Sequence, residues 1–322
     1  MGINNIKNKD KVENNIYRPE IDGIRAIAVT VVILNHINKD LIPSGFLGVD
    51  MFFVISGFVI TSSLSKRKSS SFFDFIISFY ERRIKRLVPG LLFFILIMVI
   101  LISFFNPFPG HSLKTGLFAI FGASNFYLYK TSIDYFASST VLNPFTHTWS
   151  LAIEEQFYLI FPLLTWITGF SKKQGNKKLI FILSLLSILS FILFIKNSFT
   201  NPMSAYFLLP SRFWEIAIGS IAYFIYTKKK NFDIFQCRFI SYLCVFFIFI
   251  SFFNPQNLFL FSIILNVIAT TVFLICINKN SLFYKILTNK LFLYIGKISY
   301  SLYLWHWGII SLTRWTFGLR IT

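Results

Sequence analysis

Two side chains that could carry chemistry lie on one face of the first apolar segment. Arg25 and His36 are eleven residues apart. In an α-helix this spacing is three turns plus roughly 20°, so both project from the same face, roughly 16 Å apart along the axis, and Asp22 lies one turn earlier. A charged group inside hydrocarbon costs about 2.5–3.5 kcal/mol, so such an ionisable stripe predicts a functional site. The alternative is that Arg25 reaches the membrane boundary while His36 is incidental.

Histidine is the side chain best suited to carry a proton in this chain. An imidazole takes up and returns a proton near neutral pH, so His36 is a candidate general base. His306 lies among large aromatic residues in the last apolar segment. That setting predicts either an interfacial aromatic belt or the lining of a sugar-sized cavity.

A dense basic cluster precedes the third apolar segment. Arg83 and Arg86 are three residues apart, on one face of an expected helix, and Lys85 is adjacent. Guanidinium groups bind phosphates with paired hydrogen bonds. The cluster therefore predicts either a phosphate site or ordinary positive charge that contacts lipid head groups.

Two adjacent carboxylates, Glu154 and Glu155, lie inside another apolar segment, where they are costly unless protonated or paired. They point about 100° apart, so we expect different tasks for them. One is expected to face Arg25, Arg212 or His36. The alternative is that both only bridge helices.

A third acidic side chain has a partner close by in the sequence. Arg212 and Glu215 are three residues apart in one apolar segment. Residues at this spacing are neighbours on a helix surface, so we expect the two to neutralise each other.

The composition places these residues in a membrane protein. Of 322 residues, 55% are hydrophobic and only 14% are charged, against about 25% in a soluble domain. The formal net charge of +18 falls mainly in short loops between apolar segments, which favours anionic lipid as a partner and argues against nucleic acid. Isolated cysteines and the lack of zinc, P-loop or dinucleotide motifs predict no metal site and no nucleotide hydrolysis.

The hydropathy pattern predicts an all-α, polytopic transmembrane helix bundle with nine to ten membrane segments. The apolar runs are at 23–41, 46–64, 88–105, 113–131, 147–170, 179–195, 204–226, 239–253, 258–277 and 292–312. The positive-inside rule assigns to the cytoplasm the N-terminus and the basic loops at 65–87, 171–178, 228–238 and 279–290. An even number of crossings must then separate the first two loops, so we expect 113–131 to be re-entrant or to lie on the surface.

The remaining organisation is simple. Residues 1–21 are predicted to form a cytoplasmic N-terminal segment and residues 22–322 a single transmembrane domain. Residues 72–86 are predicted to form a cytoplasmic interfacial helix, with an aromatic half and a basic end. Pro89 is expected to begin a separate spanning helix.

Five stretches together resemble the acyltransferase-3 family, the integral-membrane O-acyltransferases that modify bacterial surface carbohydrates. In family order they are Tyr17–His36, Gly45–Phe58, Arg82–Pro89, Trp149–Tyr158 and Ser299–Trp307. The resemblance implies an acyl donor, usually acetyl-coenzyme A, in the cytoplasm. It implies a hydroxyl acceptor on a surface carbohydrate (lipopolysaccharide, capsule, exopolysaccharide or peptidoglycan) at the outer side of the bacterial inner membrane.

The family's motifs match individual residues of this chain. Its Arg-x10-His motif corresponds to Arg25 and His36, and its Arg-x-x-Arg motif to Arg83 and Arg86. Its acidic residue in the Trp-Ser-Leu stretch corresponds to Glu154 in preference to Glu155. The resemblance further suggests that Asp50, Ser56 and Gly57 help to build a central cavity. The expected substrate-binding residues are Asp50, Ser56, Glu155 and His306.

The expected mechanism follows from these matches. The phosphates of coenzyme A dock on Arg83, Lys85 and Arg86. His36 then acts as general base towards the acceptor hydroxyl, or relays the acyl group as an acyl-imidazole.

Two further residues complete the expected catalytic group. Arg25 is expected to hold the donor or to stabilise developing negative charge. Glu154 is expected to orient the imidazole.

The chain departs from the family pattern at its C-terminal end. A last helix with a basic tail does not follow Thr322, and Gly308 stands where a proline often follows Trp-His-Trp. No extracytoplasmic esterase domain is visible, so a separate extracytoplasmic partner domain is expected. The alternative functions are a transporter or flippase of a lipid-linked sugar, and a truncated, inactive acyltransferase remnant.

Overall fold

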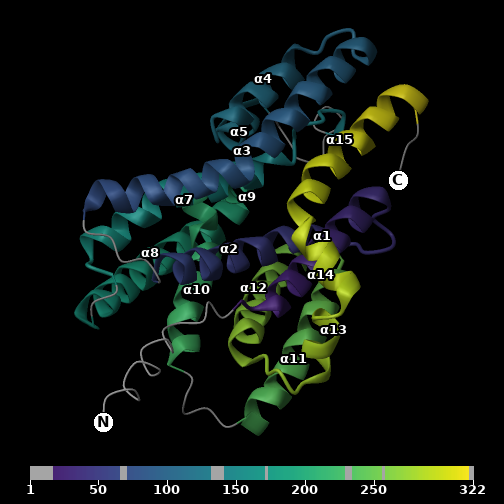
Figure 1. The fold of residues 1–322 in the computed structure, drawn as a ribbon. Helices are drawn as coiled ribbons and strands as arrows, with labels where there is room; N and C mark the ends of the chain where they lie inside the picture. Colours follow the sequence, from purple (N-terminus) through teal and green to yellow (C-terminus); the bar gives the residue numbers. More distant parts are fainter. Residues whose placement is uncertain are drawn as a thin grey trace, which may run out of the picture.

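The computed structural model describes residues 17–65, 71–131, 141–170, 173–228, 234–255 and 258–318. Within these ranges every regular element is a helix, which confirms the predicted all-α class (Figure 1). The helices are α1 Pro19–Ile37, η1 Gly45–Leu47, α2 Gly48–Ser65, α3 Phe72–Phe105, α4 Gly110–Ile120, α5 Ser124–Thr131, α7 Thr148–Ile167, α8 Lys173–Thr200, α9 Pro202–Phe207, α10 Leu209–Thr227, α11 Ile234–Phe253, α12 Phe259–Cys276, α13 Leu282–Leu287, α14 Lys290–Lys297 and α15 Ser299–Phe317. The basic residues at 66–68, 172, 229 and 230, which carried part of the loop-charge argument, lie outside the described ranges.

Local sequence signals explain where several helices begin. Pro19 occupies the first turn of α1, where its missing N–H costs nothing. The side chain of Ser71 accepts a hydrogen bond from the backbone N–H of Asp74 and caps α3. Asn201 caps α9 in the same way through the N–H of Ser204. These caps satisfy backbone donors that a helix leaves unpaired at its first turn.

The third helix is longer than predicted. α3 runs without interruption over 34 residues, with Pro89 inside it. The prediction of a separate spanning helix that begins at Pro89 was therefore wrong, while the interfacial position of residues 72–86 stays a prediction. A proline inside a helix removes one backbone hydrogen bond. Flanking turns continue the helix on both sides of Pro89, so the basic cluster and the apolar span belong to one continuous helix.

Three predicted segments are divided by breaks in the backbone. Segment 113–131 contains the end of α4 and all of α5, joined at Gly122, whose φ of 62° is in the left-handed region. The two helices are about 16 Å and 12 Å long, so neither crosses a core about 30 Å thick. This agrees with the expectation that the segment is not one spanning helix. Segments 204–226 and 292–312 are divided at Leu208 and Ile298, where one continuous helix was expected.

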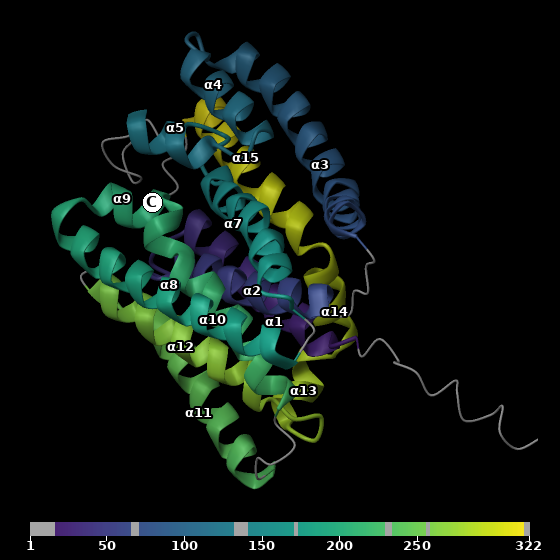
Figure 2. The ribbon, with the colours of Figure 1, turned by 90° about the vertical axis from the view of Figure 1, so that its left-hand side faces the viewer.

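The first two long helices form the centre of the bundle. α2 packs against α1, α7, α10 and α12. In both ribbon views α1 and α2 lie in the middle, with α3 and α4 on one side and α11 and α12 on the other (Figures 1 and 2). Residues 19–65, which form α1 and α2, therefore lie at the centre of the helix bundle.

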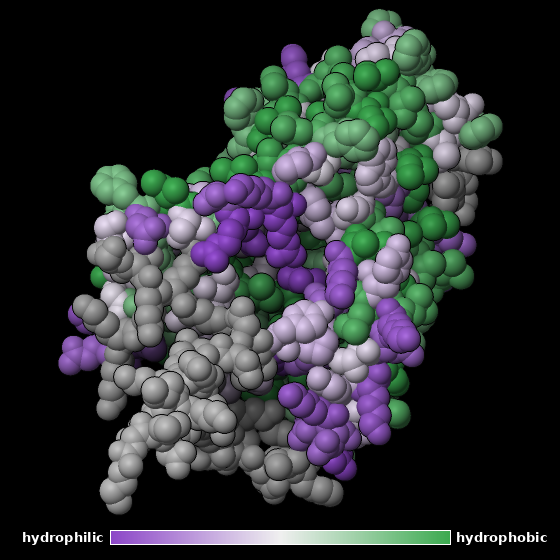
Figure 3. Space-filling model, viewed as in Figure 1, coloured by the Kyte–Doolittle hydropathy of each residue, from purple (hydrophilic) through white to green (hydrophobic). Residues whose placement is uncertain are grey.

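The outer surface suits a membrane. Four described helices are long and apolar enough to cross one: Gly45–Ser65, Phe72–Phe105, Gln174–Thr200 and Phe259–Cys276. Figure 3 shows hydrophilic side chains gathered across the middle and lower part of one face, while the upper part is mostly hydrophobic. The full count of nine to ten membrane segments stays a prediction.

Glycine lets α2 and α10 cross at very short range. A Cβ atom built on Gly57 would lie 1.9 Å from the carbonyl oxygen of Ile216, and one built on Gly219 would lie 2.0 Å from that of Val54. Both obstacles are backbone atoms, which cannot move aside as a flexible side chain would. Only glycine fits at these two positions.

We expect Gly57→Ala to destabilise the bundle by about 1–3 kcal/mol, because it forces two packed helices apart. The measurement is thermal unfolding of the detergent-solubilised protein. Gly110→Ala is the matched control, since a Cβ there meets nothing within 4 Å. Equal melting temperatures for the two variants would contradict the close crossing.

Candidate functional site: an arginine-lined cavity and a histidine cluster

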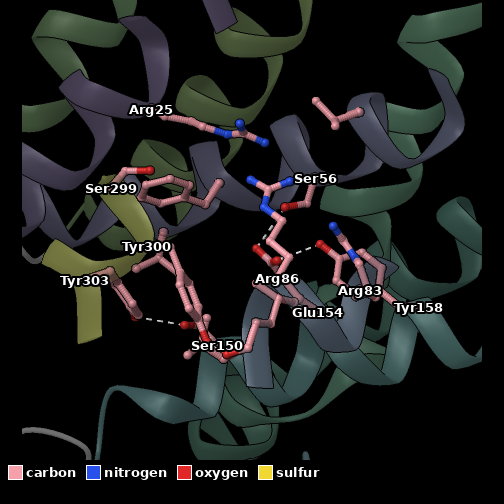
Figure 4. A pocket seen from close by; sticks show the side chains of 15 residues that line it. Arg25, Ser56, Arg83, Arg86, Ser150, Glu154, Tyr158, Ser299, Tyr300 and Tyr303 are labelled. Atoms are coloured by element: carbon pink, nitrogen blue, oxygen red, sulfur yellow. Dashed lines mark hydrogen bonds between the residues drawn. The ribbon is translucent and has the colours of Figure 1, made fainter. Parts of the chain in front are cut away.

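Five helices enclose a cavity on one side of the bundle. It contains about 690 Å³ of space free of protein atoms, including its opening to solvent. Its polar lining comes from α1, α2, α3, α7 and α15 and consists of Arg25, Ser56, Arg83, Arg86, Ser150, Glu154, Tyr158, Ser299, Tyr300 and Tyr303 (Figure 4). Residues far apart in the sequence therefore meet at one place.

Three guanidinium groups gather around this cavity. Arg25 projects from α1, while Arg83 and Arg86 come from one face of α3, as their spacing predicted. Arg83 lies over the ring of Tyr158, with its guanidinium carbon 3.6 Å from the ring centroid, and its buried Nε has no hydrogen-bond partner among the described residues. Arg86 is exposed at the mouth. A buried, unsatisfied donor beside other cations favours an anionic ligand.

Glu154 is the carboxylate within this group. Its two oxygens accept hydrogen bonds from the Ser56 hydroxyl at 2.9 Å and from the Tyr158 hydroxyl at 2.7 Å. Arg25 has its own carboxylate partner in Asp22, at 3.2 Å. Of the three partners that the sequence left open for this carboxylate, Arg25 is the one that lines the same cavity.

Two of the expected binding residues lie elsewhere. Lys85 is exposed and pairs with Glu81 at 2.6 Å, outside the cavity lining. Glu155 points towards the turn between α4 and α5, because a Cβ on Gly122 would come within 2.4 Å of its Oε2. Adjacent residues of a helix point about 100° apart, so Lys85 and Glu155 face away from the cavity that their neighbours Arg86 and Glu154 line.

The histidines form a second cluster, beyond the cavity. His36 Nδ1 lies 2.9 Å from His306 Nε2, and the two rings are nearly parallel. The His147 ring centroid is 5.6 Å from that of His306, and Trp307 packs its ring edge-on against His36. His147 and His306 are buried, whereas His36 is partly exposed.

This geometry corrects two predicted roles. The imidazole of His36 is hydrogen-bonded to His306, while Glu154 is bonded to Ser56 and Tyr158, so Glu154 does not orient the ring. Arg25 lies about 16 Å from His36 along α1, because eleven helical residues separate them. Arg25 can therefore hold a ligand in the cavity but cannot stabilise charge that develops beside His36.

Tyr303 connects the cavity with the histidine cluster. Its hydroxyl lies 2.8 Å from the Ser150 hydroxyl and donates to the His147 carbonyl at 3.1 Å. Its ring also packs against the rings of His147 and His306. The Tyr303–Ser150 pair therefore stands between the arginines and the histidines.

A second charged group lies fully buried between α2 and α10. Arg212 Nη1 contacts Asp50 Oδ1 and Glu215 Oε1, each at 2.8 Å. The expected pairing of Arg212 with Glu215 is confirmed, but Asp50 is a third member that sequence spacing did not reveal. Asp50 therefore holds the bundle together and does not line the cavity, in contrast to its predicted role.

Several lining residues were missed by sequence reasoning although a signal for them existed. Ser150, Glu154 and Tyr158 are four residues apart from one another on α7, so they share one face. A spacing of three residues links Tyr300 to Tyr303 and Tyr303 to His306 along α15, which also keeps them on one face. Polar residues at this period inside an apolar helix mark a buried polar face.

Comparison with known proteins found a family and sequence relatives for this chain. A family model described as an acyltransferase domain matches residues 18–320. The O-acetyltransferase OatA from Staphylococcus aureus strains NCTC 8325 / PS 47 and COL is 34% identical over 326 residues, covering 96% of this chain and 53% of each relative. The chain therefore spans about half the length of the curated relatives it matches. No solved structure matches it.

Replacing Arg212 tests the buried charge group. We expect Arg212→Met to cost about 3–5 kcal/mol of stability, because it leaves the Asp50 and Glu215 carboxylates buried without their cation. The measurement is thermal unfolding in detergent. Arg238→Met, at an exposed site, is the matched control.

A second variant replaces the two carboxylates with neutral amides of the same shape. Adding Asp50→Asn and Glu215→Gln to Arg212→Met removes the unpaired charges, so much of the lost stability should return. If Arg212→Met melts like the Arg238 variant, the triad contributes nothing to the fold.

Proposed function

Since the chain belongs to the acyltransferase-3 family, we propose that it is a membrane O-acetyltransferase. It transfers an acetyl group from acetyl-coenzyme A in the cytoplasm to a hydroxyl of a cell-surface carbohydrate. Its Staphylococcus aureus relatives are O-acetyltransferases by name, which supports this reaction class. The observation that carries the proposal is the meeting of Arg25, Arg83 and Arg86 around one cavity in an otherwise apolar bundle.

The arginine-lined cavity is the proposed site for the phosphates of the donor. Each guanidinium can form two parallel hydrogen bonds to phosphate oxygens, and the unpartnered Nε of Arg83 supplies one donor that the protein itself leaves unsatisfied. Arg86 at the open mouth is placed to meet the anion first. Lys85 has no part in this site, since it points away from the cavity.

The acceptor is proposed to react at His36, at the opposite end of α1. The pantetheine arm of the donor must pass the Tyr303–Ser150 pair to bring the thioester there. His36 removes the proton of the acceptor hydroxyl, and the alkoxide oxygen forms a bond to the carbonyl carbon while the carbon–sulfur bond breaks. The proton then passes to the leaving thiolate, so no net charge is produced.

The membrane arrangement completes the proposal. The protein has nine to ten segments in the bacterial inner membrane, one of them not spanning, with the arginine end inside and His36 towards the outside, as the loop charges indicate. Separating donor and acceptor along one helix lets a cytoplasmic thioester serve an external alcohol.

Donor binding is tested on the purified protein with acetyl-coenzyme A as the probe. Arg83→Gln and Arg86→Gln should each weaken binding at least about tenfold, which is about 1.4 kcal/mol, through loss of charge-assisted hydrogen bonds. Arg82→Gln is the control, because Arg82 is an exposed neighbour on the same helix and is not part of the cavity lining. Equal affinities for all three variants would exclude the cavity as the donor site.

Catalysis is tested by His36→Ala. We expect acetylation to fall about 10²–10⁴-fold, the usual effect of losing a general base, while acetyl-coenzyme A still binds. The measurement is the O-acetyl content of surface polysaccharide by mass spectrometry. His111→Ala, on α4 and away from both clusters, should leave that content unchanged. Near-normal acetylation by the His36 variant would refute the assignment, and an acetyl group trapped on the imidazole would show a covalent relay in place of base catalysis.

A further inference from the structure

The hydrogen bonds around His306 determine which of its ring nitrogens carries a proton. His306 Nδ1 lies 2.7 Å from the backbone carbonyl oxygen of Tyr303. A carbonyl oxygen can only accept, so Nδ1 must be the N–H donor. In a neutral imidazole the other nitrogen, Nε2, is then an acceptor with a free lone pair.

The same logic extends to His36. Its Nδ1 lies 2.9 Å from His306 Nε2, which is an acceptor, so His36 Nδ1 must donate. The lone pair of neutral His36 therefore resides on Nε2. No described residue donates to that nitrogen, and the ring is partly exposed.

We infer that His306 is a positioning residue that fixes the tautomer and orientation of His36, so that Nε2 of His36 is the atom that accepts the substrate proton. The inference rests on the proposed function, because it assumes that His36 is the base. It replaces the substrate-binding role predicted for His306 and the orienting role predicted for Glu154.

The surroundings of His306 suit this task. The ring is 8% exposed and is packed by the rings of Tyr303 and His147, so it has little freedom to rotate. Its own proton is directed by a backbone carbonyl within α15, which cannot change its hydrogen-bonding character. A base held by a rigid second group is the arrangement found in catalytic triads, where the third member sets the tautomer of the histidine.

The His36–His306 bond also suits the charged state of the reaction. When Nε2 of His36 takes the hydroxyl proton, the ring becomes an imidazolium with an N–H on both nitrogens. Its Nδ1–H keeps donating to His306, and a hydrogen bond from a charged donor is stronger than one from a neutral donor. His306 therefore gains no proton and loses none. The proton on Nε2 leaves with the thiolate.

A plain packing role for His306 makes a different prediction from the positioning role. A ring of similar size without nitrogen would satisfy packing, whereas positioning requires an acceptor at the place of Nε2. The side-chain oxygen of glutamine lies near that place. His306→Phe and His306→Gln therefore separate the two roles.

The kinetic test uses membrane vesicles that contain the full chain and their native polysaccharide, with radiolabelled acetyl-coenzyme A as the probe. His306→Phe should lower kcat at least about tenfold and leave the KM for acetyl-coenzyme A within about twofold, as expected for loss of an orienting hydrogen bond. His306→Gln should recover most of the rate. A wild-type rate for His306→Phe, or an equally slow His306→Gln that still binds acetyl-coenzyme A, would overturn the inference.

The rate of His36→Ala in the same vesicles tests the proposed function separately from the positioning role of His306. If His36→Ala retains its rate, the proposed function fails. If His36→Ala is inactive while His306→Phe is fully active, only the positioning role of His306 fails.

Nitrogen NMR provides a readout that packing alone would not change. The chain has only four histidines, so ¹⁵N-histidine spectra of the detergent-solubilised protein can be assigned with single variants. Wild-type His36 should show a protonated Nδ1 and an unprotonated Nε2. In His306→Phe the two neutral tautomers should become mixed. A wild-type spectrum with the proton on Nε2 would contradict the assignment.

Discussion

The cost of burying charge in an apolar bundle governs the whole arrangement of this protein. An ion removed from water must be paired, and it must be hydrogen-bonded as well. The Asp50–Arg212–Glu215 group satisfies this rule internally, with both carboxylates on one guanidinium. The cavity does not satisfy it internally. There, Arg25 is paired with Asp22, whereas Arg83 and Arg86 have only the lining carboxylate of Glu154, which is already held by two hydroxyls.

The two charged groups therefore differ in kind although they share α2. The buried triad is closed and links α2 to α10 beside the glycine crossing, where backbone contacts leave no room for adjustment. The cavity is open and keeps a cationic surplus together with an unsatisfied guanidinium nitrogen. Rigid packing on one side of α2 supports an unsatisfied site on the other, which is how a preorganised anion site is maintained without its ligand.

Helix geometry also separates the two halves of the proposed reaction. α1 and α15 contact each other, and each carries a cavity residue at one end and a histidine further along. On α1 the separation is about 16 Å, roughly half the thickness of a hydrocarbon core. A donor site at one level and a base at another suit a reaction whose substrates arrive from opposite sides. The Tyr303–Ser150 pair lies at the junction of the two sites.

The sequence alone determined the features that depend on amino-acid composition and on the spacing of residues along a helix. Composition indicated the membrane class and the all-α fold, and loop charge led us to expect that 113–131 is not a simple span. Fixed helical spacing predicted the common face of Arg25 and His36 and that of Arg83 and Arg86. Tertiary structure decided the partners: His306 for His36, Ser56 and Tyr158 for Glu154, and Asp50 for Arg212. Those pairs join helices far apart in the chain, and which faces meet depends on how each helix is rotated and packed. It also decided that α3 continues through Pro89, because a helix tolerates one missing hydrogen bond when the turns on both sides remain packed.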